Sequence, residues 1–472
     1  MAPLVFVHGT HGQDDPWYVS TSPLATAARA AGLELACPEP FRWSGEIGGL
    51  PVGLAPQAAD DPVQDRRLFT WAVEARHLVY YCHAARPPKA GRSQEVSLVA
   101  HCFDVETEAL TPGGWVPHTR LEPGAEVLTW QREKQRAEWQ PVVAVHRYDH
   151  FTEMIHFRGR MVDLMVTPDH GLWAGFPGSN RSRSWLTWQE ATAAAAITRC
   201  RRFVIRTAGR ESDSYLPIAD AWLRVLAWLM AEGNIQVRGP RLEVQVSQSD
   251  APDGRLQMLL DDLRECGIDC ATYLRYRGGT TVHGTHRNWD AYRIRFRRTR
   301  GHIPEWEPLL RRYLGTTKTP SPELWALAGQ QAEVFLQRYV LADGSQTGET
   351  TYQISAKRRD HIDFLQSLVT RLGYRSRVHA RPRFGRTGIV YCLSYRKADA
   401  VATISVKKGR ARRVPYQGIA WCVSVPNGTV FVRRNGCVAL TLNSHGGAIG
   451  ILAIAAYGLK VRHLITAATP VR

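Results

Sequence analysis

The sequence predicts a multidomain chain: an all-β domain with an α+β insertion, flanked by two pieces of an α/β sheet. Three observations predict this organisation. A single strand-turn-helix pattern is interrupted, because VSLVAH (96–101) is separated by more than three hundred residues from SHGGAIGILAIAAYG (444–458). Short β-like runs with Pro and Gly turns stand at both ends of the intervening segment. The middle of that segment repeats a helix-acid-glycine-strand pattern.

Length and composition set the class of protein. A chain of 472 residues is too long for one ordinary core, so we expect several domains. Hydrophobic residues make up 44% and charged residues 22%, and the chain contains no apolar run of about 18 residues, so we expect no membrane association. The start MAPLVFVHGTHG lacks a basic segment followed by an apolar one, so no signal peptide is expected. Nine cysteines without framework spacing favour a reducing, cytoplasmic location.

The positive charge is concentrated in the middle. The net charge is +17, and residues 102–443 carry 49 Lys and Arg against 33 Asp and Glu. The outer segments, 1–101 and 444–472, carry 11 against 10. Such a bias favours a polyanionic partner for the middle segment, most often a nucleic acid, over a basic surface that is merely solvated.

The outer segments read as one domain when they are joined. The junction becomes Ala100-His101-Ser444-His445-Gly446, a small-x-Ser-x-Gly turn that lifts a serine hydroxyl above a sheet edge. Backbone N–H groups there, with one from the His8-Gly9 loop, would hold an oxyanion. Joined in this way, residues 1–101 and 444–472 resemble α/β-hydrolase lipases and esterases. The resemblance implies that Ser444 is the nucleophile of the joined protein, acting on an ester that the sequence does not identify.

The hydrolase pattern is incomplete. In that family the acid and the histidine follow the serine, and only 28 residues follow Ser444. We therefore predict no esterase activity from the chain as it stands.

The residues at the two junctions provide the nucleophiles and the asparagine that excision of the middle segment requires. Cys102 is its first residue, Asn443 is its last, and Ser444 follows directly. A thiol can accept the preceding acyl group as a thioester, and the serine hydroxyl can then take that group over. The asparagine amide can attack its own carbonyl and release the segment, provided that both junctions lie within reach of each other in the folded chain.

These residues and two further motifs resemble an intein. MVTPDHGLWAG (165–175) resembles the block whose threonine and histidine, here Thr167 and His170, polarise the upstream bond, and residues 418–443 resemble the C-terminal blocks. The resemblance implies an all-β Hint-type splicing domain built from 102–205 and 406–443, which needs no cofactor. Leu442 stands where many inteins have a histidine, and Cys422 where many have an acid.

Two cysteines are open as the first nucleophile. Trp173, Cys422 and Thr441 resemble the Trp-Cys-Thr set of a phage-associated intein class in which the internal cysteine attacks the upstream junction. That class usually lacks a nucleophile at the first position, yet Cys102 is present. Both Cys102 and Cys422 are therefore candidates, and we favour participation of Cys422.

The interior of the segment carries a second signal. The interior contains two similar segments, VLAWLMAEGN (225–234) and LQRYVLADGS (336–345). A strand, an amphipathic helix and a basic segment follow each copy. Ala231 and Ala342 are small enough for the two helices to pack closely, which would bring Glu232 and Asp343 together. Paired carboxylates of this kind hold hard divalent cations and can assist attack on phosphates.

Residues 206–405 resemble a single-chain LAGLIDADG homing endonuclease. The resemblance implies that Glu232 and Asp343 are the metal-binding acids, that Mg²⁺ is the cofactor, and that double-stranded DNA is the partner. Arg338 stands where the family usually keeps a glycine, and this bulky side chain is expected to loosen or reshape the helix pair. Two competing interpretations are a DNA-binding protein that no longer splices and an unspliced, truncated lipase or esterase.

Overall fold

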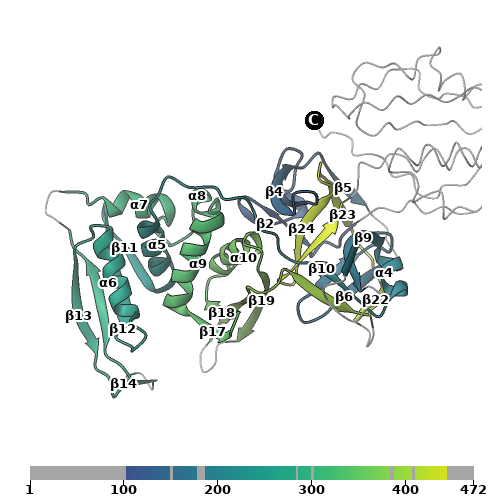
Figure 1. The fold of residues 1–472 in the computed structure, drawn as a ribbon. Helices are drawn as coiled ribbons and strands as arrows, with labels where there is room; N and C mark the ends of the chain where they lie inside the picture. The colour runs from purple at the N-terminus through teal and green to yellow at the C-terminus, as the bar shows by residue number, and fades with distance from the viewer. Residues whose placement is uncertain are drawn as a thin grey trace, which may run out of the picture. The chain divides into compact units, whose positions relative to one another are not determined.

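The computed structural model describes residues 102–148, 153–177, 186–282, 285–298, 302–382, 387–406 and 410–443. The predictions for the hydrolase segments 1–101 and 444–472, including His8, Gly9 and Ser444, lie outside the described residues. Residues Cys102–Asn443 form one compact unit (Figure 1). No helix in the described ranges is long and apolar enough to cross a membrane.

The beginning of the unit is built almost entirely of strands. They are β1 (Glu108–Thr111), β2 (Gly114–Pro117), β3 (Glu126–Gln131), β4 (Arg136–Pro141), β5 (Ala144–Tyr148), β6 (Glu153–Arg158), β7 (Asp163–Val166), β8 (Gly171–Pro177), β9 (Leu186–Thr192) and β10 (Arg202–Arg206). The 3₁₀ helix η1 (His118–Arg120) and the helix α4 (Ala193–Arg199) interrupt them.

The end of the unit returns to these strands. Its strands are β21 (Val401–Ser405), β22 (Ala411–Pro415), β23 (Ala420–Ser424), β24 (Thr429–Arg434) and β25 (Cys437–Leu442). β23 pairs with β5, β22 with β6, β21 with β10, and β24 with β1, all antiparallel. Both ends of the unit therefore belong to one β-rich body, and its core includes Phe103, Phe157, Phe203 and Trp421.

The middle of the unit contains the repeat. Its first half is α5 (Asp220–Glu232), β11 (Gly233–Arg238), β12 (Arg241–Ser249), α6 (Arg255–Glu265), β13 (Cys270–Tyr276), β14 (Thr280–Val282), β15 (Thr285–Arg287) and β16 (Ala291–Phe296). After α7 (Trp306–Tyr313) and α8 (Pro322–Trp325), the second half is α9 (Gly329–Asp343), β17 (Gly344–Gly348), β18 (Thr351–Ala356), α10 (Arg359–Arg371), β19 (Arg375–Pro382) and β20 (Ile389–Arg396).

The two halves share one topology. The sheet of the first half has the order β11-β12-β16-β13, and the second half has β17-β18-β20-β19. Each of these runs has four strands, and if these are counted along the chain, their order across the sheet is first, second, fourth, third in both halves. In both halves an α-helix follows the second strand in the sequence. The α+β fold of a two-fold repeat, predicted from the sequence pattern, is therefore present.

The second half of the repeat is not separate from the β-rich body. β19 pairs with β25 at Arg377 and Cys437, which joins β17–β20 to β25, β24, β1 and β2 in one eight-stranded sheet. β21 falls within the predicted 206–405 range but pairs with β10 of the β-rich body. The repeat itself therefore ends with β20.

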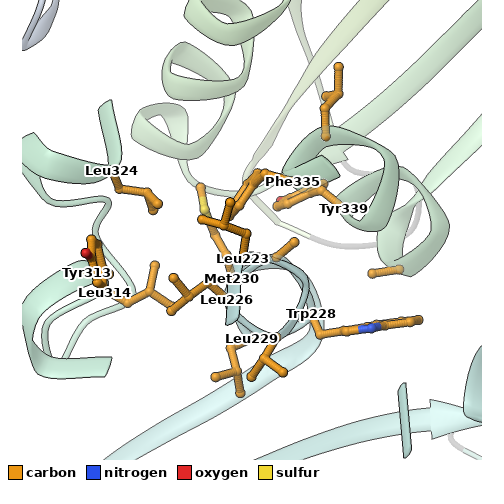
Figure 2. Close-up of a cluster of buried hydrophobic side chains, with 14 of the residues drawn as sticks. Leu223, Leu226, Trp228, Leu229, Met230, Tyr313, Leu314, Leu324, Phe335 and Tyr339 are labelled. Carbon is orange, nitrogen blue, oxygen red and sulfur yellow. The ribbon is translucent and has the colours of Figure 1, made fainter. Parts of the chain in front are cut away.

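The core of the repeat is built around α5. Figure 2 shows Leu226, Trp228 and Met230 pointing from this helix in different directions, within one buried cluster that includes Phe335 and Tyr339 of α9. A helix that is apolar on nearly every side is stable only where it is buried. α5 meets this condition because α9, α6 and the strand β12 all contact it.

Candidate functional site

The repeat brings its two acids to equivalent places. α5 and α9 pack side by side, and Glu232 and Asp343 are the last residues of these two helices (Figure 1). A glycine follows each acid and starts the next strand. A Cβ on Gly233 would lie 2.5 Å from the carbonyl oxygen of Leu229, and one on Gly344 would lie 2.8 Å from the Cα of Val340. The glycine of each acid-glycine pair is thus required by close backbone approach.

The pKa values of both carboxylates are raised. Burial, and then the negative charge of Asp343, raises the pKa of Glu232 to about 7. Burial raises the pKa of Asp343 to about 6, and the positive charge of Lys318 opposes this rise. Asp343 is exposed, so water screens part of its shift. The ionised forms of both acids are disfavoured in this environment, so the pair favours the binding of a cation.

Lys318 is a basic residue of this site that the sequence pattern did not single out. Its Nζ donates to the carbonyl oxygens of Met230 at 3.1 Å and of Gly233 at 2.8 Å, which caps the end of α5. Its backbone has a φ of 60°, and its own carbonyl oxygen lies 2.7 Å from Nε2 of the buried His361. Lys318 lies in the linker between the two halves, so neither copy of the repeat contains it.

The donor set fits a hard divalent cation. Within the described ranges, no group of three or more His, Cys, Asp or Glu could hold a metal by itself. Glu232 and Asp343 would supply two carboxylate ligands. Mg²⁺ is commonly bound through one or two carboxylates together with water and substrate phosphate oxygens. This pair therefore suits a metal that is shared with a phosphate-bearing substrate.

A basic groove lies on the first sheet of the repeat. Val244, Val246 and Ile294 face the core, so the alternate residues of β12 and β16 face outward. The groove has a volume of about 760 Å³ and is lined mainly by polar side chains: Gln236, Glu243, Gln245, Tyr273, Arg275, Arg293 and Arg295. A concave face with three arginines and several amide or hydroxyl groups is suited to a phosphate backbone.

Arg338 does not open the helix pair. Its Nε lies 3.0 Å from Oδ2 of Asp262 in α6, and α5 and α9 remain packed together. Asp262 also accepts hydrogen bonds from Nε of Arg224 at 2.7 Å and from Nε1 of Trp228 at 2.8 Å. The guanidinium is thus turned toward α6 and is paired there, whereas the sequence predicted that it would loosen or reshape the helix pair.

The second candidate site is a pair of thiols in the β-rich body. Phe103 and Trp421 form an antiparallel bridge, with N–H···O distances of 2.7 and 2.9 Å. The next residues on the two strands are Cys102 and Cys422, and their thiols are in hydrogen-bond contact. Both side chains are fully buried. Burial raises the pKa of the Cys102 thiol well above its usual value, and contact with Cys422 adds to the effect.

Thr167 holds the backbone of Cys102 from the other side. The N–H of Cys102 donates to Oγ1 of Thr167 at 3.1 Å, and the N–H of Thr167 donates to the carbonyl oxygen of Cys102 at 3.0 Å. The N–H of His170 donates to the carbonyl oxygen of Thr167 at 3.0 Å, and its ring centroid lies 4.7 Å from that of Phe103. Thr167 and His170 thus lie around the residue that carries the upstream junction nitrogen.

Asn443 lies close to the same strand. Its Nδ2 donates to the carbonyl oxygen of Val425 at 3.4 Å, and its N–H donates to that of Gly428 at 3.1 Å. Val425 is three residues beyond Cys422, and an extended chain covers this step in about 11 Å at most. Both ends of the unit therefore lie along the segment from Trp421 to Val425.

Two polar atoms of the predicted set are buried without a partner in the described part of the chain, and Trp173 lies in another cluster. Oγ1 of Thr441 and Oδ1 of Asn443 are buried and have no hydrogen-bond partner among the described residues. Trp173 packs in a separate apolar cluster, where its ring is stacked on Trp188 at 6.4 Å.

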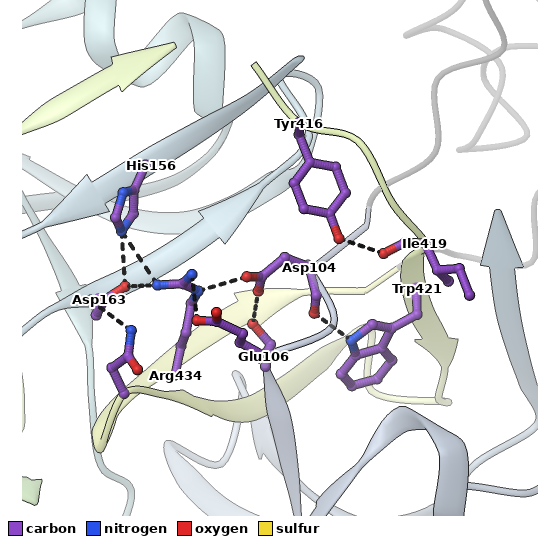
Figure 3. A network of polar contacts seen from close by, with 10 residues as sticks. Asp104, Glu106, His156, Asp163, Tyr416, Ile419, Trp421 and Arg434 are labelled. Carbon is purple, nitrogen blue, oxygen red and sulfur yellow. Dashed lines mark hydrogen bonds and ion pairs between the residues drawn. The ribbon is translucent and has the colours of Figure 1, made fainter. Parts of the chain in front are cut away.

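A network of charges fixes the segment that follows Cys102. Figure 3 shows Arg434 of β24 between Asp104 and Asp163, at 2.8 and 2.5 Å, with Glu106 at 2.8 Å. The carbonyl oxygen of Asp104 accepts a hydrogen bond from Nε1 of Trp421 at 2.8 Å. These contacts tie the start of the unit to β23 and β24, and so keep the two thiols in register.

His146 is a second residue that the sequence pattern did not reveal. It lies in β5 directly opposite Cys422. In the sequence it is one of several polar residues in a short strand, AVHRY. Only the strand pairing relates it to a cysteine that follows more than two hundred residues later.

Comparison with known proteins identifies part of the repeat. Residues 330–407 match the LAGLIDADG-like domain family. This range runs from the start of α9 through β21, so the match covers the second half of the repeat.

Several solved structures show weak similarity to the chain. They include "I-DmoI in complex with DNA and Mn", with 12% identity, 37% of this chain and 89% of that chain covered, and a TM-score of 0.26. An I-DmoI G20S variant with its target DNA and Mg has 12% identity, coverages of 37% and 88%, and a TM-score of 0.26. Full-length DUF199/WhiA from Thermatoga maritima has 11% identity, coverages of 39% and 54%, and a TM-score of 0.25.

One curated relative also matches. It is a "DNA-directed RNA polymerase subunit beta C-terminal section" from Stigeoclonium helveticum, 22% identical over 400 residues. The match covers 73% of this chain and 36% of that protein. The chain thus spans about a third of the length of this relative, whose activity belongs to the larger protein.

Proposed function

We propose that the repeat within residues 206–405 is a site-specific endonuclease of double-stranded DNA that uses Mg²⁺. The observation that carries the proposal is the pair of carboxylates at the ends of two packed helices, at equivalent points of two repeated halves. The match of residues 330–407 to the LAGLIDADG-like domain family supports it. The arginines of the groove on β13 and β16 would bind phosphates and position the duplex.

The roles of the site residues follow from their positions. Glu232 and Asp343 would hold Mg²⁺ between the two halves. The bound metal would supply stabilisation of the charge that develops on the scissile phosphate. Lys318 would fix the end of α5 and lower the repulsion between the two acids before metal and DNA bind.

Cleavage of a library of randomised duplexes tests the proposal. The purified chain is incubated with the library and either Mg²⁺ or a chelator, and cut molecules are sequenced. We expect Mg²⁺-dependent cuts at a defined sequence, and we expect the double variant Glu232→Gln, Asp343→Asn to bind that sequence without cutting it. Undiminished cutting by the double variant would overturn the assignment of the acids.

We further propose that residues 102–443 excise themselves and join the flanking segments. The position of Cys102 beside Cys422, and of Asn443 beside Val425 three residues further along the chain, supports this second function. A thiol would take the acyl group of His101 from the nitrogen of Cys102, and the Ser444 hydroxyl would accept it. Cyclisation of Asn443 would release the unit, and an O-to-N shift would leave a normal peptide bond. No cofactor enters these steps.

Mass spectrometry of the expressed chain tests excision. We expect a species of residues 102–443 and a joined product of 1–101 with 444–472, in which Ser444 would be the hydrolase-like nucleophile. Separate Cys102→Ala and Cys422→Ala precursors identify the first nucleophile, and full splicing by Cys422→Ala would exclude its participation. A chain that remains whole and still binds DNA would favour the non-splicing alternative. Cys102 and Cys422 form no disulfide, which suits a reducing, cytoplasmic setting.

A further inference from the structure

Three side chains form a row across adjacent strands next to the upstream junction. Cys422 in β23 lies opposite His146 in β5, and on the other side it contacts the Cys102 thiol. Side chains of directly opposite residues lie on the same face of a sheet, with Cβ atoms about 4.5–5.5 Å apart. Trp421 and Val423 face the apolar core, so the row lies on the opposite face of β23.

Attack by a thiol of this row requires the loss of its proton. A thiolate, not a thiol, attacks a carbonyl carbon. Cys102 is buried and its pKa is raised well above the usual value, so it does not ionise by itself. A group that accepts the thiol proton during the attack is therefore required.

His146 is suited to accept that proton. Its Nε2 lies 3.0 Å from Oγ of Ser424, and its ring is stacked on Tyr148, so two contacts fix the orientation of the imidazole beside its strand partner Cys422. Burial lowers the pKa of His146, which keeps the ring neutral and able to take up a proton near pH 7. His170 lies on the side of Phe103, whose ring faces the apolar core.

We infer that His146 is the general base of the first acyl shift, acting on the Cys422 thiol. The imidazole takes the S–H proton as the sulfur attacks the carbonyl carbon of His101. A C–S bond forms, the C–N bond to Cys102 breaks, and the imidazolium returns the proton to the Cys102 nitrogen. Atoms and charge balance without a further reactant. This role rests on the proposed excision and adds a residue to it.

Cleavage by an external thiol isolates this step. In a full-length precursor with Asn443→Ala, which blocks release, dithiothreitol intercepts the thioester and frees residues 1–101. We expect His146→Ala to slow this cleavage by about 100-fold or more, the usual contribution of a general base. Added imidazole should restore part of the rate, because His146 is only partly buried and its removal leaves a space that solvent can reach.

Controls separate a chemical role from a packing role. His286→Ala changes an exposed histidine on the β14–β15 hairpin and should leave cleavage unchanged. His146→Asn, which keeps a polar contact for Ser424, serves if the alanine variant does not fold. Thermal melting checks the fold of each variant.

Each outcome decides the inference. A slow His146 variant that imidazole rescues supports it. Cleavage at the parental rate, or slow cleavage without rescue in a folded variant, overturns it while the proposed excision stands. Absence of cleavage in the parent, together with an intact chain in the unmodified protein, overturns the excision itself.

Discussion

Arg433 of β24 and Asp363 of α10 form a buried ion pair, with Nη1 and Oδ1 2.5 Å apart. The same guanidinium binds Glu108 of β1 through Nη2 at 2.7 Å, and its side chain is only 1% exposed. One arginine thus connects the β-rich body, which carries the thiol pair, with the second half of the repeat, which carries Asp343. Together with the β19–β25 pairing, it makes the two functional parts a single stable unit.

Replacing Arg433 with methionine should destabilise this unit strongly. The change keeps the volume of the side chain but leaves Glu108 and Asp363 without their shared cation. Removing one partner of a buried ion pair costs about 3–5 kcal/mol. Both acids are partly exposed, so we expect the lower end, about 3 kcal/mol, in the free energy of unfolding measured with urea. The matched control Arg412→Met, on the exposed side of β22, should stay within about 0.5 kcal/mol, and a similar result for Arg433→Met would refute the coupling.

The carboxylate pair should make stability depend on pH. The folded-state pKa values of Glu232, about 7, and Asp343, about 6, lie above their unfolded values. The native state therefore binds more protons than the unfolded state between about pH 4 and 7. Stability from these groups is fully present below this window and is lost as the pH rises through it. Chemical denaturation at a series of pH values without metal measures the effect.

Mg²⁺ and a double variant test the origin of this pH dependence. Mg²⁺ should restore stability at pH 7–8, because it binds the deprotonated native pair and not the unfolded chain. The variant Glu232→Gln, Asp343→Asn should show a smaller loss between pH 4 and 7 and no response to Mg²⁺. An unchanged pH profile in that variant would assign the dependence to other groups.

Asp262 and Arg338 should contribute unequally to stability. Asp262→Ala leaves Arg224, Arg338 and the indole N–H of Trp228 without their common acceptor, and we expect a loss of about 3–5 kcal/mol. Arg338→Ala leaves Asp262 bound to its other two donors, and we expect about 1 kcal/mol. Urea unfolding of both variants and of the double variant measures the coupling. Equal losses for the two single changes would contradict the central position of Asp262.

The sequence predicted the features that local patterns encode. The apolar helices that end in Glu232 and Asp343 were predicted because acid and glycine recur at the same point of both copies. Cys102 and Cys422 were predicted only as alternative first nucleophiles, and not as a pair in contact. Their contact depends on the bridge between Phe103 and Trp421, which the sequence does not reveal.

Features set by long-range strand pairing or by the path of a loop could not be predicted. Lys318 reaches the end of α5 from the linker between the halves, and His146 lies opposite Cys422 only through the pairing of β5 with β23. Arg338 was expected to disturb the helix pair because its partner, Asp262, lies in another helix. The sheet shared by the repeat and the β-rich body likewise depends on one contact, Arg377 with Cys437.

The two glycines that follow the acids provide the sharpest test of how the backbone positions the site. Gly233→Ala would place a Cβ 2.5 Å from a carbonyl oxygen of the preceding helical turn, and Gly344→Ala would place one 2.8 Å from Val340. Backbone atoms cannot yield as a flexible side chain can, so each substitution should shift the end of its helix and cost about 1–3 kcal/mol.

Because each acid directly precedes its glycine, the same shift should weaken Mg²⁺ binding, measured by titration calorimetry, even where the variant remains folded. Gly113→Ala is the matched control, since the atom nearest to its Cβ lies 4.0 Å away, and it should change neither property. If the Gly233 and Gly344 variants bound Mg²⁺ as the parent does, the metal would not be held at the ends of these two helices.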